Sequence, residues 1–175
     1  MSASIYIAAY EILKESIIER IKDFFTNGFD EKGYIIDDKY YSEVLSRNKN
    51  HLYASLDWLK HNNVINEIDL ICFDTNRTFR NNLAHQMQHF LTSIDDVELE
   101  MRFMDMIGLL NKIEKWWILN VEIAIDDEWA GKDIKEDMII PGPVMTLQIM
   151  REVAFGGEEE SRKYYEYFKK NFRGT

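Results

Sequence analysis

The feature that most constrains the fold is a succession of apolar side chains at three- and four-residue steps, which proline scarcely interrupts. The chain has 175 residues, and its two prolines both lie in Pro141-Gly142-Pro143. Between residues 96 and 125 one stripe of an ideal helix collects Leu99, Phe103, Met106, Leu110, Ile113, Trp117, Val121 and Ala124. A second stripe collects Val97, Met101, Met104, Trp116 and Ile123. We therefore expect this helix, capped by residues 93–96, to be the most buried element.

Further helices are predicted along the rest of the chain. An amphipathic helix is expected over about residues 3–27, ending at Asn27-Gly28, with a loop over residues 28–38. Two short helices follow at about 39–47 and 51–61, and Asn62-Asn63 marks a break after them. Helical periodicity resumes at Ile65 and continues through Phe73. Possible N-caps between Asp74 and Thr78 leave open whether one helix or two occupy the next stretch.

The C-terminal third contains the longest expected irregular connection, over residues 126–142. Pro143 can open a helix that runs to Phe155, because proline is tolerated in a first helical turn. A last helix is expected from Glu158-Glu159-Glu160 to Arg173, with acidic residues at its start and basic residues at its end. Together these segments predict an all-α fold: a single helical domain over residues 1–175, built as a bundle of about six or seven helices.

Composition narrows the class of protein. Hydrophobic residues make up 46% of the chain and aromatic residues 13%, which is typical of a folded domain. No uncharged apolar run reaches about 18 residues, so a cytoplasmic protein without a membrane span is expected. Cys72 is the single cysteine and lies in an apolar run, where a thiol usually behaves as a small hydrophobe. An intramolecular disulfide is excluded.

The net charge is −10 and the isoelectric point is near 4.9. Broad, non-specific binding of nucleic acid depends on many lysine and arginine contacts to phosphate, so an acidic chain is poorly suited to it. A cleft lined by Arg77, Arg80 and their symmetry mates can still be locally basic on an acidic body. An acidic exterior also suits a toxin that a basic protein partner neutralises.

The most informative motif is Arg80-Asn81-Asn82-Leu83-Ala84-His85, inside an apolar-periodic segment. A guanidinium offers a planar fork of donors to phosphate oxygens and keeps its charge at any working pH. An imidazole exchanges protons near neutrality, so it can act on a ribose hydroxyl or a leaving oxygen. This pair of residue types can carry out phosphoryl chemistry without a metal ion.

The spacing Arg80-Asn81, three residues, then His85 resembles the signature of the HEPN domains, a superfamily of all-α proteins. Its members occur among bacterial toxins, abortive-infection and phage-defence proteins and RNA-processing nucleases. The resemblance implies a HEPN-like, metal-independent endoribonuclease that acts on RNA without a cofactor. It also implies a homodimer in which two copies of the motif form one site, with an antitoxin or defence protein as a possible partner. HEPN toxins paired with a nucleotidyltransferase often carry a tyrosine two positions after the histidine, where this chain has Met87.

Helical geometry bears on how the motif can act. Phe79, Leu83 and Met87 fall on one inward arc of the helix, and His85 falls nearly opposite its centre. Five helical steps separate Arg80 from His85 by about 140°, so the two side chains do not converge within one subunit. A composite site at a two-fold interface resolves this. We expect Arg80 and His85 to be catalytic there, with Asn81, Arg77 and His89 in supporting or substrate-positioning roles.

Other chemistry has weaker signals. His85 and His89 are one helical turn apart, a spacing that can chelate zinc, but Gln86 replaces the glutamate of the His-Glu-x-x-His pattern, and no metal site is predicted. The aromatic sets Tyr40-Tyr41 and Tyr164-Tyr165-Tyr167-Phe168 are expected to serve helix packing more than base stacking. Two alternatives to the nuclease remain open. One is a non-catalytic HEPN-like module that binds RNA, a nucleotide or a protein, and the other is a helical scaffold in which Arg80 and His85 make structural hydrogen bonds.

Overall fold

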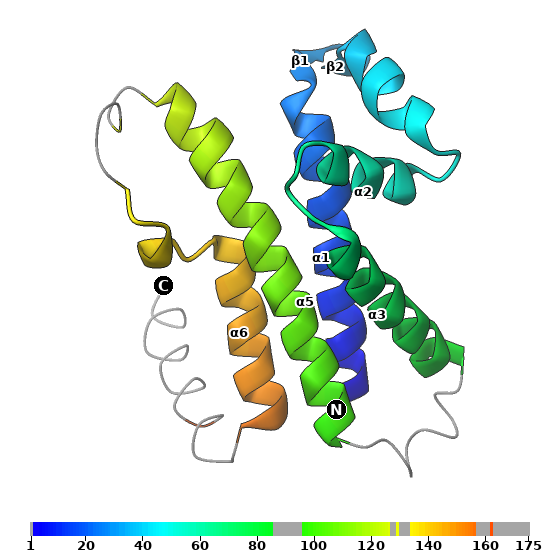
Figure 1. Cartoon of the computed structure of the whole chain (residues 1–175), viewed down its shortest axis with the longest axis vertical. Coiled ribbons are helices and arrows are strands. Elements are labelled where there is room, and N and C mark those ends of the chain that lie inside the picture. The colour runs from blue at the N-terminus through cyan, green and yellow to red at the C-terminus, as the bar shows by residue number, and fades with distance from the viewer. Residues whose placement is uncertain (1, 86–95, 127–128, 130–133, 157–161, 163–175) are drawn as a thin grey trace.

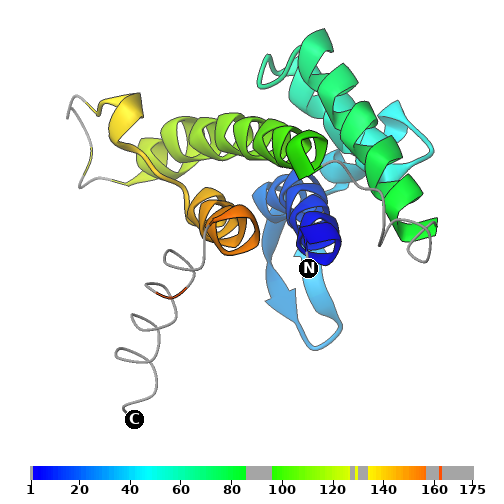
Figure 2. The ribbon, with the colours of Figure 1, turned by 90° about the horizontal axis from the view of Figure 1, so that it is seen from below.

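The computed structural model describes residues 2–85, 96–126, 129, 134–156 and 162, and within them the fold is mostly helical. Two long helices, α1 (Ser2–Phe24) and α5 (Asp96–Trp117), lie against each other in the middle and run in the same direction (Figure 1). The helix α3 (Glu67–His85) packs against both, and α6 (Gly142–Phe155) packs against both from the other side of α5 (Figure 2). The predicted helical fold is confirmed for these residues.

The core forms where α1 and α5 meet. On α1 the inward face carries Ala9, Leu13, Ile17 and Ile21, none of which is exposed. On α5 the first predicted stripe is confirmed as far as Trp117, since Leu99, Phe103, Met106, Leu110 and Ile113 are fully buried. Beyond α5, Val121 is only half-buried and Ala124 is exposed. The second stripe is exposed in its first half, where Val97 is 67% exposed, Met101 57% and Met104 45%, whereas Trp116 and Ile123 are half-buried. The expectation that the two stripes make α5 the most buried element is therefore not met at these three exposed positions, although α5 contacts α1, α3 and α6.

The segment after α1 differs most from the prediction. α1 ends at Phe24, and Asn27-Gly28 lies in a strand instead of stopping the helix. Strands β1 (Thr26–Asp30) and β2 (Gly33–Ile36) pair as an antiparallel hairpin where a loop is predicted, and Phe29 lies opposite Tyr34. Gly28 and Gly33 have φ values of 132° and 120°, which glycine adopts readily and other residues rarely do. These conformations permit the irregular register between Thr26 and Phe29 and the tight turn between the strands.

Two short helical turns follow the hairpin, a wide π-helical turn at Tyr40–Val44 and a 3-10 turn at Leu45–Arg47. They confirm the expected helical segment, and α2 (His51–His61) matches its predicted bounds. Tyr40 is buried as expected, whereas Tyr41 is 53% exposed and packs its ring against Tyr40, with centroids 5.8 Å apart. The second aromatic set, from Tyr164, lies outside the described residues.

The helix α3 is a single helix, which answers the question that the sequence leaves open. Asn66 caps it: its side-chain oxygen accepts from the backbone N–H groups of Ile68 and Asp69 at 2.9 and 3.1 Å, and its own N–H donates to the Asp69 carboxylate. Thr75 and Thr78 do not cap a new helix, because their hydroxyls donate to carbonyls one turn back. The motif therefore occupies the last two turns of a long, capped helix.

After α5 the chain stays helical through a π-helical turn at Ile118–Glu122 and a 3-10 turn at Ile123–Ile125, so the predicted end near residue 125 holds. A short 3-10 turn follows at Glu136–Met138. α6 begins at Gly142 with proline in its first turn, as predicted, and ends at Phe155. The expected cap at 93–95 and most of the last predicted helix lie outside the described residues.

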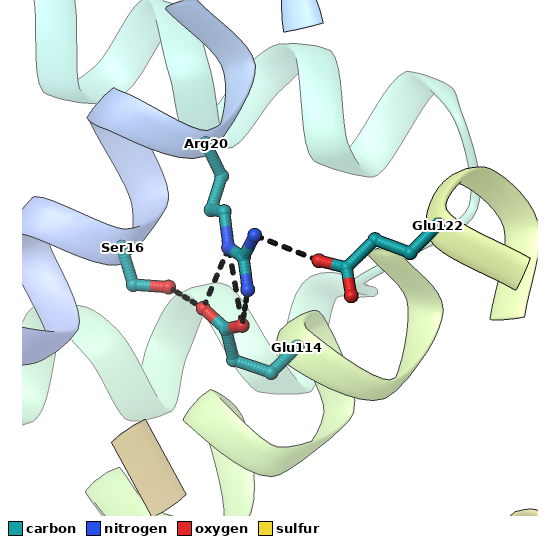
Figure 3. A network of polar contacts seen from close by, with 4 residues as sticks. All are labelled: Ser16, Arg20, Glu114 and Glu122. Atoms are coloured by element: carbon teal, nitrogen blue, oxygen red, sulfur yellow. Dashed lines mark hydrogen bonds and ion pairs between the residues drawn. The ribbon is translucent and has the colours of Figure 1, made fainter. Parts of the chain in front are cut away.

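A polar network joins α1 to α5 (Figure 3). The buried Glu114 carboxylate of α5 accepts hydrogen bonds from the Ser16 hydroxyl and from the Arg20 guanidinium, whose Nη2 lies 2.5 Å from Oε2. Arg20 also pairs with the exposed Glu122 at 2.8 Å. Since Glu114 is only 1% exposed, its charge is compensated almost entirely from α1, and the network fixes the register of the two helices.

Candidate functional site at the α1–α3 junction

Arg80 leaves α3 on the side that faces α1. Its Nη2 donates to Oε1 of Glu11 at 2.6 Å, and its guanidinium carbon lies 5.7 Å from the ring centroid of Tyr10. Its Nη1 donates to Oδ1 of the neighbouring Asn81 at 3.3 Å. The side chain is 29% exposed, so it is half-buried between the two helices but still reaches solvent. Arg80 and Asn81, which the sequence predicts to act together, do lie in contact.

Glu11 has a second cationic partner one turn along α1, because it also accepts a hydrogen bond from Lys14. Desolvation of Glu11 opposes ionisation, but the hydrogen bonds and charges of Lys14 and Arg80 outweigh it and hold the pKa of Glu11 below its ordinary value. Glu11 is therefore an anion at neutral pH and can hold Arg80 against α1.

Tyr10 provides the apolar support of the site. Its ring is 4% exposed and packs against Phe73 of α3, with centroids 5.8 Å apart. Burial raises the pKa of Tyr10 to about 12, although Arg77 and Arg80 nearby lower it in part. The Tyr10 hydroxyl is therefore a neutral donor at any physiological pH, beside two arginines.

Arg77, one turn before Arg80, points towards α2. Its Nη1 donates to the Tyr53 hydroxyl at 2.7 Å, and the Tyr53 hydroxyl in turn donates to the Asp74 carboxylate. Partial burial and the neighbouring Asp74 raise the pKa of Tyr53. Arg77 thus belongs to a series of hydrogen bonds that links α2 to α3. This series is adjacent to the contacts of Arg80 but does not include Arg80.

These contacts define the α1–α3 junction: Tyr10, Glu11 and Lys14 of α1, Tyr53 of α2, and Asp74, Arg77, Arg80 and Asn81 of α3. Three cationic side chains, Lys14, Arg77 and Arg80, face two carboxylates, Glu11 and Asp74. The junction is therefore locally positive on a chain whose net charge is −10. The predicted cleft, which also needs the symmetry mates of Arg77 and Arg80, stays a prediction. Guanidinium groups, an amide and a phenol gathered in this way can bind a phosphate or another oxyanion.

The two histidines of the prediction are less fully placed. His85 is the last residue of α3, one turn after Asn81, and its side chain lies outside the described part of the structure. His89 also lies outside it. On an ideal helix the His85 position is about 140° around the axis from Arg80. Of the predicted site residues, the structure thus brings Arg80 and Asn81 into contact, whereas Arg77 donates to Tyr53 of α2.

Sequence reasoning missed the residues that α1 and α2 contribute to this junction. Glu11, Lys14 and Tyr10 lie about 70 positions from Arg80, and Tyr53 lies 24 positions from Arg77. Glu11 and Lys14 have the spacing of an intrahelical ion pair, and that was the one local signal available. Nothing in the sequence alone connects them with Arg80.

Comparisons with family models, with curated proteins and with solved structures found no match. Among the described residues, no three side chains of histidine, cysteine, aspartate or glutamate gather in a way that holds a metal ion. No described helix has the length and apolar character needed to cross a membrane.

Proposed function

We propose that this protein is a metal-independent endoribonuclease of the HEPN type, with a site shared between the α3 helices of two subunits. The observation that carries the proposal is the motif at the end of α3: a guanidinium that is partly solvent-exposed and backed by Asn81, followed one turn later by a histidine position. A toxin or phage-defence role follows from the resemblance, as does an antitoxin or defence protein as partner. A cytoplasmic location is part of the same proposal.

In the proposed reaction, His85 of one subunit takes the proton from a ribose 2′-hydroxyl, and the oxygen attacks the adjacent phosphorus. Arg80 stabilises the charge that develops on the non-bridging oxygens. His85 of the second subunit gives a proton to the departing 5′-oxygen. The products are a 2′,3′-cyclic phosphate and a 5′-hydroxyl end, and no step uses a metal ion.

The contact between Arg80 and Glu11 adds a condition to this mechanism. A guanidinium that already pairs with a carboxylate has fewer free donors for a phosphate. Arg80 still has donors beyond the one at Glu11, and Lys14 shares the charge of Glu11. We therefore expect Glu11 to aim the guanidinium while its remaining N–H groups meet the phosphate.

The test is RNA cleavage by purified protein in the presence of EDTA. The wild type is expected to cut single-stranded RNA and to leave cyclic phosphate ends. His85→Ala and Arg80→Ala are expected to lose activity by roughly a hundredfold or more, as for the removal of a general base or an oxyanion donor. His51→Ala, an exposed histidine at the start of α2, serves as the matched control and should retain activity. A requirement for divalent metal in every cut, or full activity of His85→Ala, would refute the proposal.

A non-catalytic HEPN-like binding module is the second candidate, and the intrachain pairing of Arg80 with Glu11 favours it. Under this alternative, His85→Ala leaves RNA affinity unchanged and no variant shows cleavage. Electrophoretic mobility shifts with the same RNA, run beside the cleavage assay, separate the two candidates.

A further inference from the structure

A pocket lies at the other end of α1 from the α1–α3 junction. It has a volume of about 670 Å³ and is lined by the end of α1, the two turns at 40–47, the end of α2 and Trp116 of α5. Its lining includes Phe24, about 20 Å along the α1 axis from Glu11. None of its lining residues belongs to the junction.

The floor of this pocket is aromatic. Phe24 is 51% exposed at its surface, and the Phe24 ring lies 6.3 Å from Trp58, which is itself 6.3 Å from Trp116. Behind them Trp58 stacks on Trp117, with centroids 5.9 Å apart and planes only 6° from parallel. A rigid aromatic floor with one ring open to solvent is suited to stacking against a flat, conjugated ligand.

The rim of the pocket is cationic. Lys39 and Arg47 supply the positive charge, His61 lies beside them, and Glu43 is the one carboxylate among the lining residues. Most other arginines and lysines of the described helices have a carboxylate partner, as Arg20, Lys60, Arg80, Lys112 and Arg151 do. Lys39, Arg47 and His61 form no ion pair with any described residue, and Arg47 uses only its Nε, which donates to the carbonyl of Glu43. The Lys39 ammonium and the outer Arg47 nitrogens are therefore available to an anion.

The wide π-helical turn at Tyr40–Val44 brings the rim residues to the aromatic floor. Ser42 and Glu43 lie in this turn, and Lys39 and Arg47 flank it. Single π-helical turns are rare and occur frequently at functional sites, because the extra residue in the turn displaces side chains that a regular helix would carry elsewhere. The carboxylate of Glu43 adds an acceptor for an amino or imino group of a ligand.

From this combination we infer that the pocket binds a nucleoside phosphate. The base stacks on Phe24 beside Trp116, and the phosphate lies between Lys39 and Arg47, away from the negative end of α2. An aromatic floor alone would accept many apolar ligands, and unpaired cations alone would accept many anions. A nucleotide has both a flat base and a phosphate within one small molecule, and ligand pockets of several hundred Å³ accommodate that size. This inference does not depend on the proposed nuclease activity at the junction.

The test uses tryptophan fluorescence, since Trp58 and Trp116 line the pocket. The four nucleoside 5′-monophosphates are titrated into full-length protein, beside the matching nucleosides and inorganic phosphate alone. We expect saturable quenching by at least one nucleotide. Its nucleoside and inorganic phosphate should each bind at least roughly tenfold more weakly than the nucleotide does.

Variants locate the site. Lys39→Ala/Arg47→Ala is expected to weaken nucleotide binding by roughly tenfold or more, because both phosphate donors are gone. Lys32→Ala/Lys49→Ala removes the same charge from two exposed lysines outside the pocket lining and should bind like the wild type. Arg80→Ala should also bind like the wild type, which separates this pocket from the junction. Circular dichroism checks that each variant folds.

Four results would overturn the inference. They are no saturable quenching by any mononucleotide at millimolar concentration, binding of RNA oligomers alone, equal affinity for nucleotide and nucleoside, or loss of binding in Arg80→Ala but not in Lys39→Ala/Arg47→Ala. The ligand comparison needs only the wild type, so it decides the question even if the double variant fails to fold.

Discussion

The Tyr6 hydroxyl of α1 donates a hydrogen bond of 2.6 Å to Oδ1 of Asn76 in α3, and both residues are buried. Asn76 also donates from its Nδ2 to the carbonyl of Cys72 at 2.9 Å, so its amide is satisfied at both ends. Burial raises the pKa of Tyr6 above its ordinary value, which keeps the hydroxyl protonated as the donor. This polar contact lies one turn before Arg80 and joins the motif helix to the centre of the fold.

Removing that hydroxyl should destabilise the protein. Tyr6→Phe leaves the Asn76 oxygen buried without its main donor, and we expect a loss of about 1–2 kcal/mol in the free energy of unfolding. Urea unfolding followed by circular dichroism measures it. Tyr34→Phe removes a hydroxyl from a side chain that is 73% exposed and should change the stability by much less. Equal losses in the two variants would contradict the assigned role.

Glu11 should make stability depend on pH in the acidic range. Its folded-state pKa lies below the ordinary value of 4.5, so its ion pairs contribute fully above 4.5 and are lost as the pH falls through the lowered folded value. The wild type should therefore exceed Glu11→Gln in stability near neutrality, and the difference should shrink as the medium is acidified below 4.5. Urea midpoints over a pH series measure this difference. Glu15→Gln, on an exposed neighbouring residue, is the matched control and should change the stability near neutrality by less than Glu11→Gln does.

Breaking the Arg20–Glu114 pair from one side should cost more than removing it altogether. Arg20→Met leaves the buried carboxylate with only Ser16 as a donor, and we expect a loss of about 2–4 kcal/mol. Adding Glu114→Leu removes the stranded charge and should restore most of that stability. Thermal and urea unfolding of the single and double variants measure the coupling. Lys60→Met, whose partner Glu67 is largely exposed, should cost less than about 1 kcal/mol.

The Asn66 cap should control the start of the motif helix. Asn66→Ala removes an acceptor for two backbone N–H groups and should cost about 1 kcal/mol, whereas Asn66→Asp should retain most of the stability. Hydrogen exchange at Ile68 and Asp69 should accelerate in the alanine variant alone. Asn82→Ala, at an exposed helical position, should have no destabilising effect. Unchanged exchange in Asn66→Ala would show that another group caps α3.

Periodicity was sufficient to predict the long helices because their buried faces are continuous. The α5 stripe from Leu99 to Trp117 is buried along its whole length, and α2 begins after an asparagine that caps it as a helix start should. Periodicity did not show which apolar faces would be covered. Val97 and Met101 have the same chemistry as the buried residues, and only the placement of α1, α3 and α6 leaves them in solvent.

The hairpin after α1 was missed because its signals are local and ambiguous. Asn27-Gly28 is typical of a helix stop as well as of a strand turn, and two strands of four and five residues carry little alternation. The pairing of Phe29 with Tyr34 becomes visible only once the register is known. Short strands are stabilised by pairing with the strand across the turn, and the sequence of one strand alone does not reveal that pairing.

The candidate site was predictable only for the part that lies within one helix. The spacing of Arg80, Asn81 and His85 is visible in the sequence, and the contact between Arg80 and Asn81 agrees with it. The partners that set the charge of the junction, Glu11 and Lys14, come from the other end of the chain. The pocket around Phe24 combines four separate segments, so no sequence window reveals it.

The long, singly capped α3 has a mechanical consequence for the motif. Asn66 caps the start of α3, and the Tyr6 hydroxyl donates a hydrogen bond to Asn76 in its middle. Rotation of the whole helix about its axis would therefore break the buried contact at Asn76. Any re-aiming of the Arg80 guanidinium must then come from rotation about its own side-chain bonds, within reach of Glu11. The helix backbone therefore holds the Arg80 Cα in place, and only the side chain of Arg80 can change its conformation to meet a ligand.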